Sequence, residues 1–379
     1  MESALEFEQK TEQSEVQKKP RLSPKTKKIL IRLFKILFPI LNLAVAGIII
    51  WYAMRTDGIS TSEIFSVRLR WEYIIATCMI VILIILLSMW RLQFSMHAMT
   101  GRFQPYLCLR MFLIERHYNL LTPFHVGGRA HQLYYMHKHK FKPHEITAIA
   151  ISHFVMGRIG FQLVTGIILL ALMSRLSQLD GGAVVNTAIW GGIALNIVTT
   201  VVVILISFNK TIPNKLGMLG VSALHKMKII KNKEKAKAAT MKTLSDYRIT
   251  VRKLMKKPSA VFGSILFASL TTFLGLIMIA FIYGALFGWS WQVIPILLLG
   301  IVLTDYAAST MPIPGGTGAM ELFFLSVFAT TFGTPQIFVA LVLWKIFSYI
   351  IPIITGIPVI IYDNVKSFRQ NKTENQRVE

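Results

Sequence analysis

Cysteines and acidic residues are both scarce in this sequence. The 379 residues include 2 cysteines, and 18 aspartates and glutamates stand against 41 lysines and arginines. Cys78 and Cys108 lie in apolar stretches on separate segments, so we expect no disulfide framework and see no metal-ligand spacing. We interpret His137 and His139, which stand among lysines, as part of a solvated loop. The sequence therefore predicts neither a metal nor a cofactor.

The short motifs of common enzyme chemistry are also missing. The sequence has no nucleophile elbow, no phosphate-binding P-loop and no His-Glu-x-x-His pattern. Its longest polar stretch, 209–257, is basic and too short for a nucleotide-binding or acyltransferase domain. ATP-driven export by this chain alone is therefore not expected.

Apolar residues, in contrast, are in excess, at 54% of the chain against 16% charged. They form continuous runs, whereas the strands of a membrane barrel alternate apolar and polar residues. A spanning helix needs roughly 20 mostly apolar residues. The fold class predicted is an all-α polytopic membrane protein. Spans are predicted at residues 30–54, 72–91, 145–173, 186–208, 259–287, 291–310 and 335–361.

The net charge of +23 is concentrated between Lys215 and Lys257, in a segment flanked by apolar runs. This is the positive-inside pattern of a cytoplasmic loop near anionic lipid headgroups. Nucleic acid is not expected as a partner, because a basic stretch alone is weak evidence for it. Basic residues before residue 29 and after residue 362 place both termini in the cytoplasm. We expect the location to be the cytoplasmic membrane of a bacterium.

These patterns divide the chain into five segments. Residues 1–28 read as a disordered cytoplasmic tail without a cleavable signal peptide. Residues 29–208 and 258–362 read as two pseudo-repeated transmembrane halves, separated by the basic loop 209–257. Residues 363–379 read as a second cytoplasmic tail.

Each half contains an apolar region that is broken by proline and paired glycines. Basic residues on both sides of 104–136 require this stretch to enter the membrane and return, which predicts a helical hairpin around Pro123, Gly127 and Gly128. Pro314, Gly315 and Gly316 break the second region, 313–333. Breaks at corresponding positions point to a transporter binding site, although both could also be simple turns between helices.

Ionisable residues gather around these breaks, where a charge inside a membrane is costly and usually functional. Amide groups at a helix start after Gly-Gly can also bind an anion. Structural alternatives are an ion pair of Glu115 with Arg116, another of Asp305 with Lys345, and a capping role for Glu321. The candidate headgroup-binding residues are Glu115, Arg116, Pro123, Gly127, Gly128, Arg129, Gln132, Tyr134, Arg158, Asp305, Pro314, Gly315, Gly316, Gly318, Glu321 and Lys345.

Two segments, 119–136 and 312–321, resemble the signatures of the lysylphosphatidylglycerol synthase/flippase transmembrane family. The first has a Thr-Pro…Gly-Gly…Gln…Tyr-Tyr frame and the second reads Pro-Ile-Pro-Gly-Gly-Thr-Gly-Ala-Met-Glu. The family includes the membrane half of the bacterial multiple-peptide-resistance factor and an archaeal dolichol-glycosylation protein. Gly128 stands where many members have Glu, and Lys345 where many have Arg. These departures leave the headgroup open.

The resemblance implies a flippase that moves an aminoacylated or polyprenyl-linked phospholipid between leaflets, a function linked in the family to antibiotic resistance. In this hypothesis Arg129, Arg158 and Lys345 neutralise phosphate, and Glu115, Asp305 and Glu321 pair with these basic side chains or with a cationic headgroup. One alternative is phosphatidylglycerol lysyltransferase activity, although the cytosolic transferase domain of longer relatives is expected to be absent. Another is a non-transporting partner of a glycosyltransferase. A membrane phospholipid is the expected partner, and homo-oligomerisation stays open.

Overall fold

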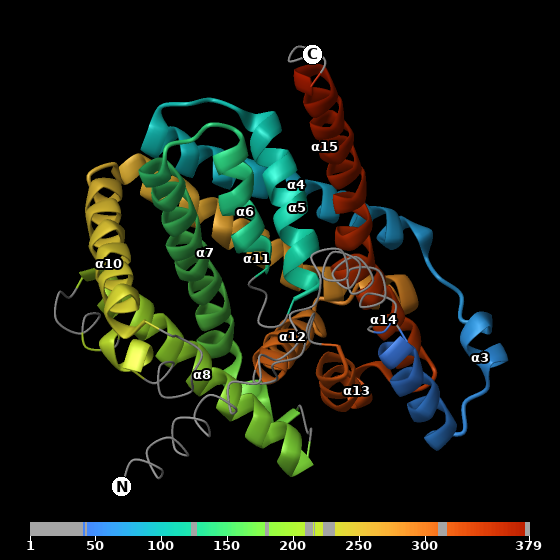
Figure 1. Cartoon of the computed structure of the whole chain (residues 1–379). Helices are drawn as coiled ribbons and strands as arrows, with labels where there is room; N and C mark the ends of the chain where they lie inside the picture. The colour runs from blue at the N-terminus through green and yellow to red at the C-terminus, as the bar shows by residue number, and fades with distance from the viewer. Residues whose placement is uncertain are drawn as a thin grey trace, which may run out of the picture. The chain divides into compact units, whose positions relative to one another are not determined.

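A computed structural model describes residues 41, 44–122, 127–178, 182–208, 215, 217–222, 232–309 and 317–375. Residues 45–379 belong to one compact unit. Every regular element among the described residues is helical (Figure 1), which confirms the predicted all-α membrane fold.

Four helical stretches are long and apolar enough to cross a bilayer. They are α4 (Trp71–Thr100), α7 (Pro143–Leu172), α11 (Pro258–Phe287) and the run of α14 (Gln336–Lys345), the π-turn η4 (Ile346–Ile350) and α15 (Ile351–Asn375). A helix of 30 residues such as α4 is about 45 Å long, more than the hydrocarbon thickness of about 30 Å. The spans predicted at 72–91, 145–173, 259–287 and 335–361 fall on these helices.

The remaining predicted spans fall on shorter elements. The span 186–208 lies within α8 (Gly182–Phe208), and 291–310 largely coincides with α12 (Ile294–Ser309). Most of the span 30–54 lies outside the described residues, which contain an apolar helix at Ala44–Thr56. The remaining short elements are α3 (Thr61–Ser66) and η2 (Met173–Gln178).

Local chemistry sets several helix boundaries. Helices α7 and α11 begin with proline, whose missing N–H costs nothing in the first turn. Helix α4 ends at Gly101, whose φ of 71° is readily adopted only by glycine. The sequence therefore marks the ends of its long helices directly.

The first broken region forms an antiparallel hairpin of α5 (Pro105–Leu120) and α6 (Gly127–Lys138). Both ends of this hairpin meet, because the Arg102 guanidinium lies 3.8 Å from the Glu145 carboxylate and 4.4 Å from the Phe141 ring centre. The predicted helical hairpin is confirmed, while its entry into the membrane stays a prediction. With 16 and 12 residues, α5 and α6 are each shorter than a spanning helix.

The second broken region forms a hairpin of α12 and α13 (Ala319–Phe332). Gly300 packs against Phe328, two positions that lie equally far from the break at residue 314. These helices have 16 and 14 residues, so each is again too short to cross the bilayer alone.

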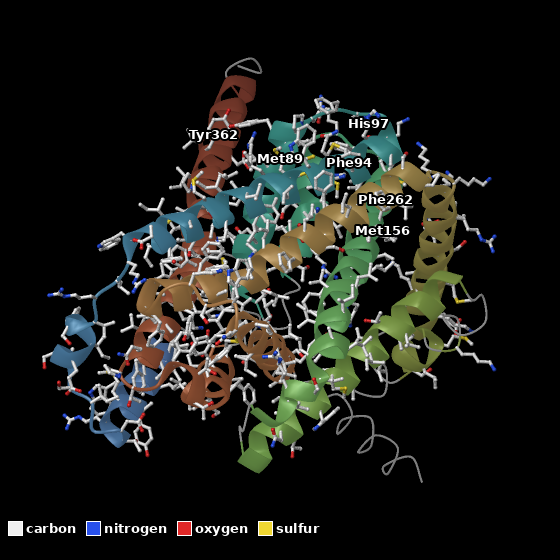
Figure 2. The ribbon with its side chains drawn as sticks, turned by 180° about the vertical axis from the view of Figure 1, so that it is seen from behind. Met89, Phe94, His97, Met156, Phe262 and Tyr362 are labelled. Carbon is white, nitrogen blue, oxygen red and sulfur yellow. The ribbon has the colours of Figure 1, made fainter. Side chains whose placement is uncertain are left out.

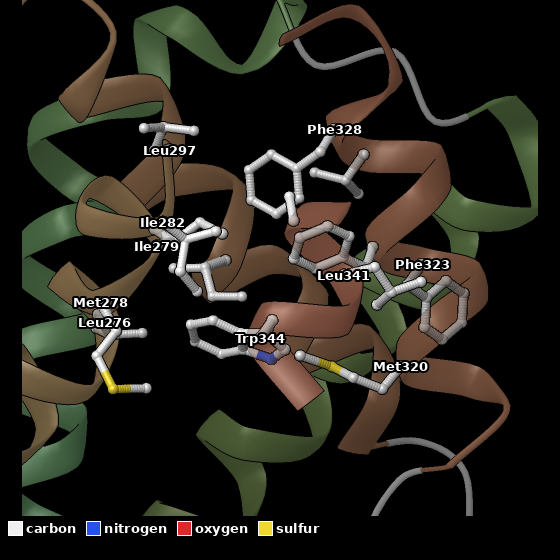
Figure 3. Packing of buried hydrophobic residues seen from close by; sticks show 14 of the residues in the cluster. Leu276, Met278, Ile279, Ile282, Leu297, Met320, Phe323, Phe328, Leu341 and Trp344 are labelled. Atoms are coloured by element: carbon white, nitrogen blue, oxygen red, sulfur yellow. The ribbon is translucent and has the colours of Figure 1, made fainter. Parts of the chain in front are cut away.

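Each hairpin has its own hydrophobic core. Helices α4 and α11 lie side by side behind both hairpins, and Figure 2 marks Phe94 on α4 and Phe262 on α11. Around the second hairpin, Figure 3 shows Trp344 of α14 between Ile279 of α11 and Met320 of α13. The core of the first hairpin is smaller and rich in methionine, with members Met89, Met96, Met111 and Met136.

The region expected as a basic loop contains a helix, α10 (Lys233–Met255), which packs mainly along α7. Its lysines Lys235, Lys237 and Lys242 are exposed. A charged face on one side and packing on the other are typical of an amphipathic surface helix.

Candidate functional site

The second break holds a buried ion pair. The Glu321 side chain is 0% exposed, and its Oε1 lies 2.5 Å from Nζ of Lys345, which is 7% exposed. Its other oxygen, Oε2, accepts the Gly318 N–H at 2.6 Å, and Gly318 has a φ of 96°. Glu321 therefore caps α13 and ties it to α14. Lys345 pairs with Glu321, so the alternative of an Asp305–Lys345 pair is wrong.

The Lys345 contact coincides with an irregular turn. The Nζ atom also lies 3.5 Å from Thr317 Oγ1 and 4.9 Å from the Tyr349 ring centre. Tyr349 belongs to the π-turn η4, which follows Lys345 directly. Such turns are rare and often lie at functional sites.

At the first break, the start of α6 is capped by side chains of the chain itself. Thr122 Oγ1 accepts the Gly127 N–H at 2.8 Å, and Asn119 Oδ1 accepts the Gly128 N–H at 3.0 Å. The expectation that free amides after this Gly-Gly pair bind an anion is therefore wrong for both groups. These two amides are therefore not available to bind an anion.

Gly128 is required by the close approach of α6 to α5. A Cβ atom there would collide with the Glu115 carbonyl oxygen and lie 2.6 Å from Asn119 Oδ1. This close packing accounts for the glycine at position 128. A side chain at this position would separate the two helices of the hairpin.

A buried polar cluster joins α4, α5 and α7 behind the first break. Arg91 donates from Nη2 to His153 Nε2 at 2.6 Å, and the Glu115 carboxylate lies 3.9 Å from the same nitrogen. Because arginine has no acceptor, His153 accepts through Nε2 and its ring is neutral. Glu115 interacts electrostatically first with Arg91, then with Arg129 and Arg116. The predicted alternative of a Glu115–Arg116 ion pair therefore describes only the weakest of the three electrostatic interactions of Glu115 with arginines.

Arg129 and Arg158 are close enough to repel each other electrostatically. Arg129 is exposed and its guanidinium lies 3.8 Å from the Phe154 ring centre, one turn before Arg158 on α7. Arg158 donates from Nη2 to Asn196 Oδ1 at 2.9 Å, while its buried Nε has no hydrogen-bond partner among the described residues. Two arginines of the predicted site therefore lie near each other.

Arg116 of the first hairpin interacts electrostatically with the second hairpin. Its side chain is exposed, and its strongest electrostatic partner is Asp305 of α12. Its neighbour His117 donates from Nδ1 to the Ile353 carbonyl of α15 at 2.9 Å, where Gly356 lets the helices approach closely. The structure thus brings together Glu115, Arg116, Arg129 and Asp305, while Glu321 and Lys345 form a separate pair.

A network of neutral polar side chains extends from Arg158 and was not identified from the sequence. Asn196 donates to Ser309 Oγ at 3.0 Å, and Gln162 donates to Thr200 Oγ1 at 2.8 Å. Tyr306 donates to Gln162 Oε1 at 3.0 Å and lies 2.8 Å from Thr165 Oγ1. Amides within the apolar runs were the signal that could have revealed this network, since they too need partners in a membrane.

A second ion pair fastens the far end of the first hairpin. Arg110 of α5 pairs with Asp363 of α15 and lies near the rings of Tyr106, Tyr135 and Tyr362. The hairpin is therefore held at its base by Arg110 and nearer its tip by His117.

The remaining predicted site residues divide by their surroundings. Gln132 is buried, and its Nε2 has no hydrogen-bond partner in the described part of the chain. Tyr134 is 61% exposed. The predicted positions outside the described residues are Pro123, Pro314, Gly315 and Gly316.

Comparison with known proteins places the chain in a family. The model described as "Lysylphosphatidylglycerol synthase TM region" matches residues 40–356, which include both hairpins and most of the last spanning stretch. Comparisons with curated proteins and with solved structures find no match. The resemblance of the two break motifs is thereby confirmed. The chain is a multi-pass membrane protein and belongs to the lysylphosphatidylglycerol synthase transmembrane family.

Proposed function

We propose that this protein moves a phospholipid between the two leaflets of the bacterial cytoplasmic membrane. The observation that carries the proposal is that Arg116, exposed on the first hairpin, lies within electrostatic range of Asp305 on the second. Charged residues within membrane segments are costly and mark ion or substrate paths. Two broken helices that carry opposite charges within electrostatic range of each other fit the architecture of a transporter site.

In this proposal the lipid headgroup passes along the first hairpin while its acyl chains stay in the bilayer. Arg129 and Arg116 meet the headgroup because both side chains are exposed. Guanidinium groups bind phosphate through two parallel hydrogen bonds, which fixes its orientation. The phospholipid classes proposed are aminoacylated phosphatidylglycerol and polyprenyl-linked lipids.

The second hairpin has a supporting role in the proposal. The Glu321–Lys345 pair fixes α13 against α14, and the same spanning stretch contacts α5 through His117 and Ile353. The last spanning stretch therefore touches both hairpins. Helix α10 lies at the cytoplasmic surface in this orientation, with its exposed lysines toward anionic headgroups.

Leaflet translocation in proteoliposomes tests the proposal. Vesicles carrying a fluorescent phospholipid are treated with a membrane-impermeant quencher, and quenching of the inner leaflet reports transport. We expect Arg116→Gln to slow quenching about tenfold, the loss of one charged hydrogen bond. Exposed Arg55 lies on another helix, so Arg55→Gln is the matched control and should keep the parent rate. Quenching no faster than in protein-free vesicles would overturn the proposal.

A further inference from the structure

The ionisable groups around the first hairpin are unequal in sign. Four guanidiniums interact with one another or with the same two carboxylates, Glu115 and Asp305. The four are Arg91, Arg116, Arg129 and Arg158. Within the described residues this cluster therefore carries two positive charges in excess.

In the described part of the chain, no further acidic group offsets this excess. His153 accepts the Arg91 hydrogen bond, so its ring is neutral and does not change the charge balance of the cluster. Glu321 is engaged by Lys345 and by the Gly318 N–H, which leaves that pair neutral as a unit. The sequence of both breaks, 121–130 and 310–320, contains no aspartate or glutamate.

The arginines are also incompletely bonded. Nε of Arg91 and Nε of Arg158 are buried without hydrogen-bond partners among the described residues. The partners that Arg158 does have, Asn196 and Tyr306, are neutral. Buried donors without acceptors and unbalanced charges in a region of low dielectric are both costly. An anion with several oxygens would relieve both.

We infer that the first hairpin binds a net anionic phosphate headgroup and disfavours a cationic aminoacylated one. The inference rests on the proposed function and narrows its substrate class. A phosphate diester brings one negative charge to the cluster and a phosphate monoester brings up to two. A lysyl ester of phosphatidylglycerol carries two ammonium groups on one phosphate, so its net charge is positive and adds repulsion.

The test measures binding and transport separately on the full chain. Purified protein in neutral detergent is titrated with short-chain phosphatidylglycerol, with its lysyl ester and with inorganic phosphate, and binding is followed by native mass spectrometry. We expect the parent to bind phosphatidylglycerol at least about tenfold more tightly than the lysyl ester. Arg158→Gln removes a positive charge and should reduce the preference for phosphatidylglycerol over its lysyl ester. Glu115→Gln removes a negative charge and should increase that preference.

Each outcome decides the inference. Equal or tighter binding of the lysyl ester overturns it, as does an absence of binding to both lipids. Inorganic phosphate that binds as tightly as phosphatidylglycerol would overturn the lipid headgroup as the source of the anion. Selective binding of phosphatidylglycerol without translocation in vesicles would support the inference about the headgroup and contradict the proposed transport function.

Discussion

The two helix breaks share proline, paired glycines and nearby charges, yet they build different environments. At the second break, Glu321 and Lys345 form a buried one-to-one pair. At the first, Arg116 and Arg129 are exposed, and the surrounding cluster has more guanidiniums than carboxylates. A closed pair stabilises a hairpin, whereas an open and unbalanced cluster is suited to bind something else.

The caps of the two breaks differ in the same way. Glu321 satisfies the start of α13 with a charged side chain that is already committed to Lys345. The start of α6 is capped by neutral Thr122 and Asn119, so this cap uses no charged side chain. The second break therefore has a structural role, and the first break is the candidate binding site.

The largest effect is expected at the second break. Glu321→Gln leaves Lys345 buried without a counter-charge, which should lower the free energy of unfolding by about 3–5 kcal/mol. Thermal unfolding in detergent measures the loss. The double variant Glu321→Gln/Lys345→Met removes both charges and should recover most of the stability. If Glu321→Gln were as stable as the parent, the Glu321–Lys345 pair would not stabilise the fold.

At the first break, a charge change should affect transport more than stability. Arg129→Gln removes an exposed guanidinium, so the melting temperature should barely move while the transport rate falls about ten- to a hundredfold, the equivalent of about 1.5–3 kcal/mol. Arg129→Lys keeps the charge but loses the planar guanidinium that can form two parallel hydrogen bonds. Its transport rate should lie between those of the parent and Arg129→Gln. Loss of stability without loss of transport would place Arg129 with the structural residues.

Packing at the first hairpin can be tested separately from its charges. Gly128→Ala forces α6 away from α5 and should destabilise the protein by about 1–3 kcal/mol. Gly166 on α7 has no atom within 4 Å of an added Cβ, so Gly166→Ala is the matched control and should be neutral or stabilising by up to about 1 kcal/mol. Equal effects of the two changes on thermal unfolding would contradict the close approach.

The smallest effect is expected in the polar network between α7, α8 and α12. Tyr306→Phe removes the hydroxyl that contacts Gln162 and Thr165 and should cost about 0.6 kcal/mol, the average for hydrogen bonds between membrane helices. Tyr283 of α11 packs its ring against Phe287 and Phe332, and its hydroxyl has no hydrogen bond among the described residues, so Tyr283→Phe is the control. Thermal unfolding of both variants measures the difference. A loss of more than about 2 kcal/mol in the free energy of unfolding would mean that the network stabilises the fold nearly as much as the Glu321–Lys345 pair does.

Much of the architecture was predictable because it follows from one-dimensional patterns. Apolar runs located the long helices, and basic residues on both sides of 104–136 predicted the first hairpin. The helix within 209–257 was missed because its composition suggested only a charged surface. Its packing along α7 gives that segment an apolar support that charge counting does not reveal.

The candidate site was predictable in its residue types but not in its pairings. Sequence spacing could not show that Lys345 reaches Glu321 and not Asp305, since the choice depends on how α13 and α14 cross. The capping of Gly127 and Gly128 by Thr122 and Asn119 depends on the turn between α5 and α6. Such contacts are fixed by tertiary packing, which leaves no trace in the pattern of charges.

The division of roles between the two breaks is tested most directly by one translocation assay on two variants. The double variant Glu321→Gln/Lys345→Met, once shown to be folded, should transport lipid within about threefold of the parent rate. Arg129→Gln should fall at least about tenfold in the same vesicles. If the double variant loses transport while Arg129→Gln retains it, the lipid path lies at the second break and the assignment of roles is reversed.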